Sequence, residues 1–147
     1  MIGSAVLHSS VSVEWSTPYS LFRQLDAEFQ FKLDAAATAE NAKCVAFFTA
    51  KEDGLARSWQ PGPIFLNPPY GRALGLWISK AYEESRLGAT VVCVVPARTD
   101  TRWFHTYVLP HAEVRFLQGR VKFGGAKYNA PFPTMVVVFR GKKEKLR

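Results

Sequence analysis

Short apolar runs alternate with segments of helical spacing along this chain. The runs at 64–66 and 90–95 have no polar residue after their first position, which is typical of strands buried on both faces. Residues 72–87 between them have the spacing of an amphipathic helix, and Gly88 is a C-terminal stop signal. The apolar positions of this predicted helix are Leu74, Trp77, Ile78, Ala81 and Tyr82.

The N-terminal part predicts a helix, a short strand and a second helix. Ser16 and Thr17 precede Pro18, a pattern in which a hydroxyl caps a helix and proline takes its first position. Residues 31–33 predict a strand that ends at Asp34, and residues 35–44 predict a short helix. The first helix has one apolar face, formed by Leu21, Phe22, Leu25 and Phe29.

The C-terminal part predicts a short helix capped by Asp100 and strands at 113–117 and 134–139, joined as an antiparallel hairpin. The element order predicts an α/β fold with an open, mostly parallel sheet and helices on both faces. We expect one domain at 14–139, an N-terminal arm at 1–13 and a basic tail at 140–147. Ligands of such sheets bind at the carboxyl ends of strands, where Asp34, Asn67 and Pro96 fall.

Composition limits the class of protein. A chain of 147 residues can bury one sizeable core, and its 48% hydrophobic residues exclude disorder as the main state. No apolar run approaches the length of a membrane helix, and the N-terminus lacks the features of a signal peptide. Cys44 and Cys93 lie in apolar settings and cannot alone build a disulfide scaffold or a zinc site. We therefore expect a cytoplasmic protein without a metal.

Charge is distributed unevenly. Residues 1–60 hold five basic and seven acidic side chains, whereas residues 61–147 hold fourteen basic and five acidic ones. Five of those fourteen lie in the tail at 140–147, yet the rest of this half remains basic. A basic half favours a polyanionic partner, most often nucleic acid.

The sequence Asn67-Pro68-Pro69-Tyr70 directly follows the first buried strand. An exocyclic aromatic amine such as N6 of adenine is a poor nucleophile, because its lone pair is delocalised into the ring. The Asn67 side-chain oxygen and the Pro68 carbonyl can accept hydrogen bonds from its two N–H groups. Pro69 stiffens the turn, and Tyr70 offers a face on which an extruded base can stack. This motif predicts methyl transfer to an amine, promoted by positioning and electrostatics.

The chain resembles the phage-type DNA N6-adenine methyltransferase (Dam) family, which uses S-adenosylmethionine. The resemblance runs from about residue 13 to 139 and implies a compact Rossmann-like methyltransferase fold. It is carried, besides the catalytic motif, by Trp15-Ser16-Thr17-Pro18, Leu33-Asp34-Ala35-Ala36-Ala37, Glu40-Asn41-Ala42, Asp53-Gly54-Leu55 with Trp59, Val95-Pro96-Ala97-Arg98-Thr99-Asp100, Gly119-Arg120-Val121-Lys122-Phe123 and Pro131-Phe132-Pro133.

The resemblance also implies which residues bind the cofactor. Thr17 and Pro18 match an element that contacts its methionine end, and Asp53 resembles the acid that holds its adenine amino group. Asp34 is expected at the ribose hydroxyls. No Gly-x-Gly loop precedes the motif, so Asp34 stands either in the first-strand motif with its glycines lost or in the second, ribose-binding motif. The full set expected at the cofactor is Trp15, Thr17, Pro18, Asp34, Ala35, Asp53, Leu55 and Asn67.

The basic half carries the expected DNA contacts. The loop at 124–131 is expected to close over an extruded base, with Tyr128 or Phe132 as a stacking group. The chain has no room for a separate recognition domain, so specificity comes from short loops or from a dimer, or it is loose; we expect a monomer or a weak homodimer. The candidate DNA-binding residues are Arg72, Arg98, Arg102, Arg120, Lys122, Lys127 and Tyr128.

The leading hypothesis is therefore an enzyme that methylates N6 of adenine in a short double-stranded DNA site by base flipping. Asn67, Pro68, Pro69 and Tyr70 form its expected catalytic centre. One alternative keeps the chemistry but takes RNA adenine or a protein glutamine as substrate. Another is a non-catalytic nucleic-acid-binding module with a degenerate cofactor site. The resemblance places the protein in a bacterial host cell if it is encoded by a phage or prophage.

Overall fold

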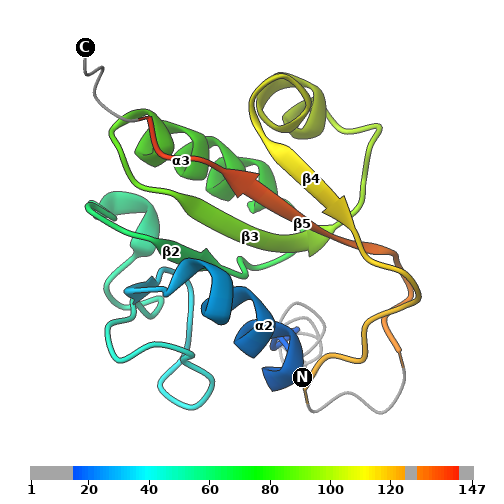
Figure 1. The fold of residues 1–147 in the computed structure, drawn as a ribbon, viewed down its shortest axis with the longest axis horizontal. Coiled ribbons are helices and arrows are strands. Elements are labelled where there is room, and N and C mark those ends of the chain that lie inside the picture. Colours follow the sequence, from blue (N-terminus) through cyan, green and yellow to red (C-terminus); the bar gives the residue numbers. More distant parts are fainter. Residues whose placement is uncertain (1–14, 125–128, 143–147) are drawn as a thin grey trace, which may run out of the picture.

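The computed structural model describes residues 15–124 and 129–142, and within them the strands form one mixed five-stranded sheet (Figure 1). The sheet order is β1-β2-β3-β5-β4. The first three strands of this order are parallel, and β5 runs antiparallel to both of its neighbours. The strands are β1 (Leu33–Asp34), β2 (Ile64–Leu66), β3 (Val91–Pro96), β4 (Glu113–Phe116) and β5 (Thr134–Phe139).

The α/β class and the antiparallel pairing of the last two strands are confirmed, but the prediction of a mostly parallel sheet is wrong. β5 lies between β3 and β4, and all of its residues pair with β3, from Thr134 opposite Pro96 to Phe139 opposite Val91. Half of the neighbouring strand pairs are therefore antiparallel. The apolar sequence of β5 after Thr134 is explained by this central position, because every residue of β3 and β5 is buried.

Helices cover both faces of the sheet. The ring of Phe22, in α2 (Tyr19–Phe29), packs edge-on against Phe65 with ring centres 5.0 Å apart. On α3 (Leu74–Arg86), Tyr82 packs against Phe139 at 6.2 Å. Phe65 and Phe139 lie in adjacent rows of the strand register, so their side chains point to opposite faces. In Figure 1, α2 accordingly lies in front of the sheet and α3 behind it.

A short helical segment packs beside α3. It comprises the π-helical η2 (Phe104–Val108) and α4 (Leu109–His111), and Tyr107 accepts a hydrogen bond from Ser79 at 3.2 Å. Its start differs from the prediction, because the hydroxyl of Thr101, not the side chain of Asp100, accepts from the backbone N–H of Phe104.

Two further local predictions are wrong. Pro18 is the N-cap of α2, not its first helical residue, and no side chain caps the helix. Residues 35–44 form turns and bends in place of the predicted helix. The start of this segment pairs with the residues that follow it, since the backbone N–H groups of Asp34 and Ala37 donate to the carbonyls of Ala46 and Phe48. The turn η1 (Gly54–Ala56) then leads toward β2.

The ends of the predicted domain fall partly outside the described residues. The arm at 1–13 and residues 143–147 of the tail lie beyond them, so these boundaries stay a prediction. Residues 140–142 contact the body of the protein. The N–H of Gly141 donates to the Thr90 hydroxyl, and that of Lys142 donates to the Ser85 carbonyl. Among the described helices, none has the length and apolar character needed to cross a bilayer.

Candidate active site

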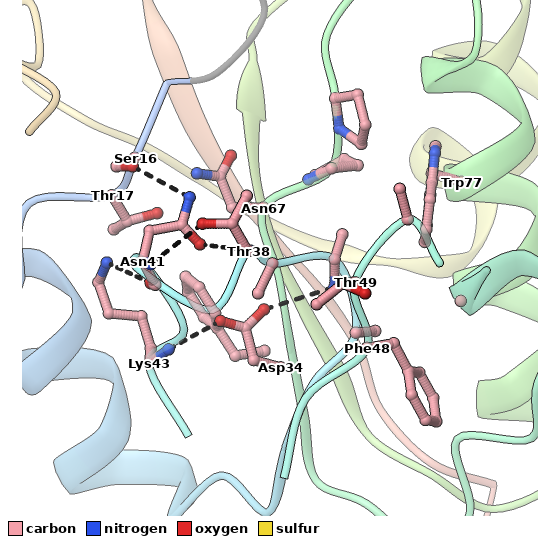
Figure 2. A pocket seen from close by; sticks show the side chains of 18 of the residues that line it. Ser16, Thr17, Asp34, Thr38, Asn41, Lys43, Phe48, Thr49, Asn67 and Trp77 are labelled. Carbon is pink, nitrogen blue, oxygen red and sulfur yellow. Dashed lines mark hydrogen bonds between the residues drawn. The ribbon is translucent and has the colours of Figure 1, made fainter. Parts of the chain in front are cut away.

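A cavity of about 490 Å³ lies where β1 and β2 end at their carboxyl edges (Figure 2). Its walls come from the segment before α2, the loop after β1, the turn at η1 and the turn after β2. Eight of the predicted site residues line it: Trp15, Thr17, Asp34, Ala35, Asp53, Asn67, Pro68 and Pro69. Pro18, Leu55 and Tyr70 are near it in sequence but do not line it.

Asp34 places a buried carboxylate in this cavity. The side chain ends β1, and the residue is 2% exposed. Its oxygens accept hydrogen bonds from the backbone N–H groups of Lys43, at 2.9 Å, and Ala36, at 3.4 Å. Burial raises the pKa of Asp34 to about 6, although these hydrogen bonds and the charge of Lys43 act in the opposite direction. The carboxyl group therefore keeps its proton to a higher pH than an ordinary aspartate does.

The loop after β1 is held by a reciprocal turn. The N–H of Thr38 donates to Asn41 Oδ1 at 2.7 Å, and the N–H of Asn41 donates to Thr38 Oγ1 at 3.1 Å. Asn41 Nδ2 also donates to Ser16 Oγ at 3.3 Å, which joins the loop to the segment before α2. The Lys43 ammonium group donates to the Asn41 carbonyl, and burial lowers its pKa. Figure 2 shows these side chains around one rim of the cavity.

Because a helix was predicted for residues 35–44, this rim of the cavity was not predicted. Thr38, Asn41 and Lys43 line the cavity, yet the sequence points only to the stretch around Asn41, through the family resemblance. The available signal was the Thr–Asn pair at a spacing of three residues, which favours a turn whose side chains bond the backbone. Phe48 and Trp77 were also missed as lining residues, because apolar side chains at such positions read as core.

The part of the cavity wall at Asp53 and Gly54 depends on a close backbone approach. Asp53 has φ of 61°, and its carboxylate accepts from the N–H of Leu55 at 3.3 Å. A Cβ atom at Gly54 would overlap the carbonyl oxygen of Ala35, so glycine is required there. The indole N–H of Trp59 donates to the Gly54 carbonyl at 2.9 Å and fixes the turn. Asp53 is thereby held at the cavity on an exposed turn.

Thr17 presents an unsatisfied polar atom. The residue is 3% exposed and lines the cavity, yet its Oγ1 has no hydrogen-bond partner among the described residues. A buried hydroxyl without a partner has a free-energy cost that a polar ligand can remove. Thr17 is therefore suited to contact a polar group bound in the cavity.

Asn67 lies directly after β2 and links three parts of the site. Its Nδ2 donates to the Trp15 carbonyl, and its Oδ1 accepts from the hydroxyl of Tyr70 at 2.8 Å. The Tyr70 ring is buried and packs edge-on against Phe123 and Phe132, with ring centres 6.2 Å and 5.7 Å away. Burial raises the pKa of its hydroxyl. In this arrangement Tyr70 supports Asn67 and presents no free face to the cavity.

The candidate DNA-binding residues within the described ranges are all exposed. Arg72 follows the catalytic turn, and the guanidinium of Arg98 lies 5.9 Å from the ring centre of Phe132. Lys127 and Tyr128 lie outside the described residues. The remaining exposed members of the set are Arg102, Arg120 and Lys122. Within residues 15–124 and 129–142, no cluster of three or more His, Cys, Asp or Glu side chains is arranged to hold a metal ion.

Known proteins with similar sequences include three named methyltransferases. A DNA N-6-adenine-methyltransferase of Escherichia phage T1 is 34% identical over 92 residues, which is 61% of this chain but 38% of that protein. The DNA N-6-adenine-methyltransferase of Haemophilus phage HP1 (strain HP1c1) is 29% identical over 137 residues, 87% of this chain and 79% of that protein. The putative methyltransferase YfdM of Escherichia coli (strain K12) is 37% identical over 67 residues, 41% of this chain and 74% of that protein.

The family model described as DNA N-6-adenine-methyltransferase (Dam) matches residues 4–145, nearly the whole chain. The match includes every segment that lines the cavity and the turn that carries Asn67. This chain belongs to the DNA N-6-adenine-methyltransferase (Dam) family.

Proposed function

We propose that this chain, as its family membership indicates, transfers the methyl group of S-adenosylmethionine to N6 of adenine in DNA. The observation that carries the assignment is the shared cavity: Asn67 and Pro68 line the same space as Asp34 and Thr17. One cavity thus holds amine acceptors beside groups suited to a nucleoside cofactor. We further propose that the mixed sheet is a compact variant of the Rossmann-like methyltransferase fold.

The residues around the cavity fit S-adenosylmethionine chemically. The Asp34 carboxylate is an acceptor for the two ribose hydroxyls, and the unpartnered Thr17 hydroxyl suits the polar methionine end. Asp53 is an acceptor for the adenine amino group, and the Trp77 ring supplies an apolar wall. We assign Trp15, Pro18, Ala35 and Leu55 supporting positions around these contacts. When bound, the cofactor supplies an electrophilic methyl group on a sulfonium sulfur.

Asn67 and Pro68 orient the target amine in this proposal. The Asn67 Oδ1 and the Pro68 carbonyl each accept one N–H hydrogen bond, which favours a tetrahedral nitrogen with its lone pair directed at the methyl group. Pro69 keeps the turn rigid, because its ring restricts the preceding residue to extended geometry. The amine becomes acidic once it carries the methyl group, so no strong base has to be positioned beforehand.

We propose double-stranded DNA as the substrate, bound through the exposed arginines and lysines of the basic half. Arg98 lies beside Phe132, which packs on Tyr70, so a phosphate held there is close to the catalytic turn. The arrangement suits capture of an extruded adenine whose flanking phosphates are held by basic side chains.

The test uses tritiated S-adenosylmethionine and unmethylated DNA. The wild-type protein is expected to label the DNA, and Asn67→Ala is expected to lower the rate at least about 100-fold. Tyr107→Phe serves as a matched control, since its hydroxyl contacts Ser79 outside the cavity, and it should retain the wild-type rate. RNA and a glutamine-containing peptide are offered in parallel as competing acceptors.

The outcomes separate the hypotheses. Label in the DNA that is lost with Asn67→Ala supports the assignment. Equal label from wild type and Asn67→Ala rejects Asn67 as the amine acceptor, and label in RNA or peptide alone rejects the DNA substrate. A folded wild-type protein that labels nothing, and that gives no heat with S-adenosylhomocysteine in calorimetry, supports a non-catalytic binding module.

A further inference from the structure

The side-chain amide of Asn67 has both of its polar atoms engaged by groups of the protein itself. Its Nδ2 donates to the backbone carbonyl of Trp15, and its Oδ1 accepts from the Tyr70 hydroxyl at 2.8 Å. A backbone carbonyl can only accept hydrogen bonds, so an amide turned over by 180° would place two oxygens against each other beside Trp15. These contacts therefore allow one orientation of the amide.

The Tyr70 hydroxyl is itself fixed by the sheet. It lies 3.0 Å from the carbonyl oxygen of Val94 in β3 as well as 2.8 Å from Asn67. Tyr70 is 6% exposed, and the edge-on packing of Phe123 and Phe132 leaves its ring little freedom to rotate. The hydroxyl has one proton for these two acceptors, and the contact to the Asn67 oxygen is the shorter of the two. With the Asn67 Nδ2 engaged by Trp15, a proton on the Asn67 side is what keeps this oxygen–oxygen contact favourable.

This arrangement leaves the Asn67 oxygen available for a substrate. A carbonyl oxygen accepts along two lone-pair directions, and Tyr70 uses one of them. Asn67 also lines the cavity, so its second lone pair can accept an N–H of the target amine. An ionised aspartate at this position would instead oppose the Trp15 carbonyl with a negatively charged oxygen and lose the hydrogen bond.

We propose that the Trp15 carbonyl and the Tyr70 hydroxyl are positioning groups that fix the Asn67 amide with its oxygen toward the substrate. This inference rests on the proposed function. They act through Asn67 and touch no reacting atom. This chain therefore requires asparagine at position 67, and an ionised aspartate cannot replace it.

The geometry also predicts a pH signature. A protonated carboxyl group introduced by Asn67→Asp can donate its O–H to the Trp15 carbonyl while its other oxygen accepts from Tyr70, as the amide does. This variant should therefore regain activity as pH falls. Other titrating groups affect wild type and variant alike, so the ratio of their rates isolates position 67. The titratable or charged groups around it are Tyr70, Arg98 beside Tyr70, and Asp34, Lys43, Lys51 and Asp53 around the cavity.

The experiment measures kcat at saturating S-adenosylmethionine for wild type, Asn67→Asp and Tyr70→Phe. At about pH 8, kcat of Asn67→Asp should be about 100-fold below that of wild type. At about pH 6, it should be only about tenfold below that of wild type. Tyr70→Phe keeps the ring but removes the donor, and should lower kcat about tenfold with KM for the cofactor unchanged. Tyr107→Phe is again the matched control for loss of a hydroxyl.

A second readout does not depend on catalysis. Carbon-13 NMR of the Asn67→Asp protein without cofactor reports the pKa of the introduced carboxyl group, which we expect well above the ordinary value of about 3.9. An ordinary pKa, a rate ratio that does not change with pH, or wild-type kcat in Tyr70→Phe would each overturn the proposal. If the wild-type protein methylates nothing, the proposed function fails, but the NMR measurement still decides whether Trp15 positions the amide.

Discussion

At the scale of single residues, the site depends on polar atoms that are buried before any ligand arrives. The Asp34 carboxylate accepts from two backbone N–H groups, and the Thr17 hydroxyl has no hydrogen-bond partner within the described residues. Both carry a free-energy cost in the free protein that a polar ligand can lower. A raised pKa at Asp34 and an unpartnered hydroxyl at Thr17 mark the same cavity.

The raised pKa of Asp34 predicts how cofactor binding depends on pH. Burial raises the pKa of Asp34 from its ordinary value of 3.8 to about 6 in the folded protein, and the ionised form is the better acceptor for ribose hydroxyls. Binding of S-adenosylhomocysteine should therefore weaken as pH falls through about 6, by about tenfold between about pH 7 and about pH 5. Calorimetry across this range should show the dependence for wild type and a flat, weak response for Asp34→Asn. Equal pH dependence in both proteins would contradict the role of Asp34.

The same shift has the opposite sign for stability without a ligand. Because the folded-state pKa is raised, the contribution of Asp34 to stability is fully present below about pH 4 and is lost as pH rises through about 6. The difference in the free energy of unfolding between Asp34→Asn and wild type should therefore grow in favour of the variant over this range. Urea unfolding at several pH values measures it, and a difference that is constant with pH would contradict the assignment.

Gly54 gives a prediction that rests on packing. Gly54→Ala should lower the free energy of unfolding by about 2 kcal/mol, because the new methyl group meets the Ala35 carbonyl and the Trp77 ring. It should also weaken cofactor binding, since both neighbours line the cavity. Gly75→Ala is the matched control: its methyl group makes only ordinary contact with Trp103, and stability should stay equal or rise slightly. Equal stability of the two variants would contradict the close approach.

At the scale of elements, apolar runs were predictable and the loop after β1 was not. Residues 64–66 and 91–96 form buried strands, as their apolar sequences indicate, and α3 falls within the predicted 72–87. The alanine-rich segment after Asp34 also matched a helix, but side-chain bonds of Asp34, Thr38 and Asn41 to the backbone favour turns there. Helix propensity weighs single residues and does not count these local bonds, and the backbone pairing of Asp34 and Ala37 with Ala46 and Phe48 depends on the fold.

The buried carboxylate of Glu84 joins α3 to the segment before β2. It accepts from the N–H of Trp59 at 3.0 Å and the side chain of Gln60 at 2.8 Å, and pairs with Lys80 at 2.8 Å. Burial alone would raise its pKa, yet these hydrogen bonds hold the pKa below its usual range. Glu84→Ala should therefore lower the free energy of unfolding by about 3 kcal/mol, measured by urea unfolding. Glu84→Gln, which keeps an acceptor for Trp59, should lose clearly less; equal losses would contradict this account.

At the scale of the whole molecule, the order of the strands in the sheet could not be predicted from the sequence. The positions of Asp34, Asn67 and Pro96 at strand ends could be predicted, because strands alternate with helices along the sequence and ligands of such sheets bind at the carboxyl ends of strands. The insertion of β5 between β3 and β4 did not, because both a hairpin at the edge and an inserted strand satisfy the same apolar pattern. The catalytic motif was recognisable from its own chemistry, whereas the cavity rim required the fold.

Charge acts at this scale as well. Arg98→Ala should weaken DNA binding and reduce the slope of log affinity against log salt by about one unit, as expected for the loss of one phosphate contact. Arg86→Ala is the matched control, because Arg86 ends α3, away from the catalytic turn, and contacts Tyr82. Fluorescence anisotropy with labelled duplex DNA at several salt concentrations measures both. Equal slopes for Arg98→Ala and wild type would remove Arg98 from the DNA interface.

The central claim is that Asn67 presents an adenine amine for methylation in DNA. Mass spectrometry of N6-methyladenine in the DNA of cells that lack adenine methylation of their own, and that express this chain, tests it most directly. N6-methyladenine is expected with the wild-type protein, and none is expected with Asn67→Ala at equal expression. DNA without the modified base in the presence of folded wild-type protein, or equal modification with Asn67→Ala, would contradict it.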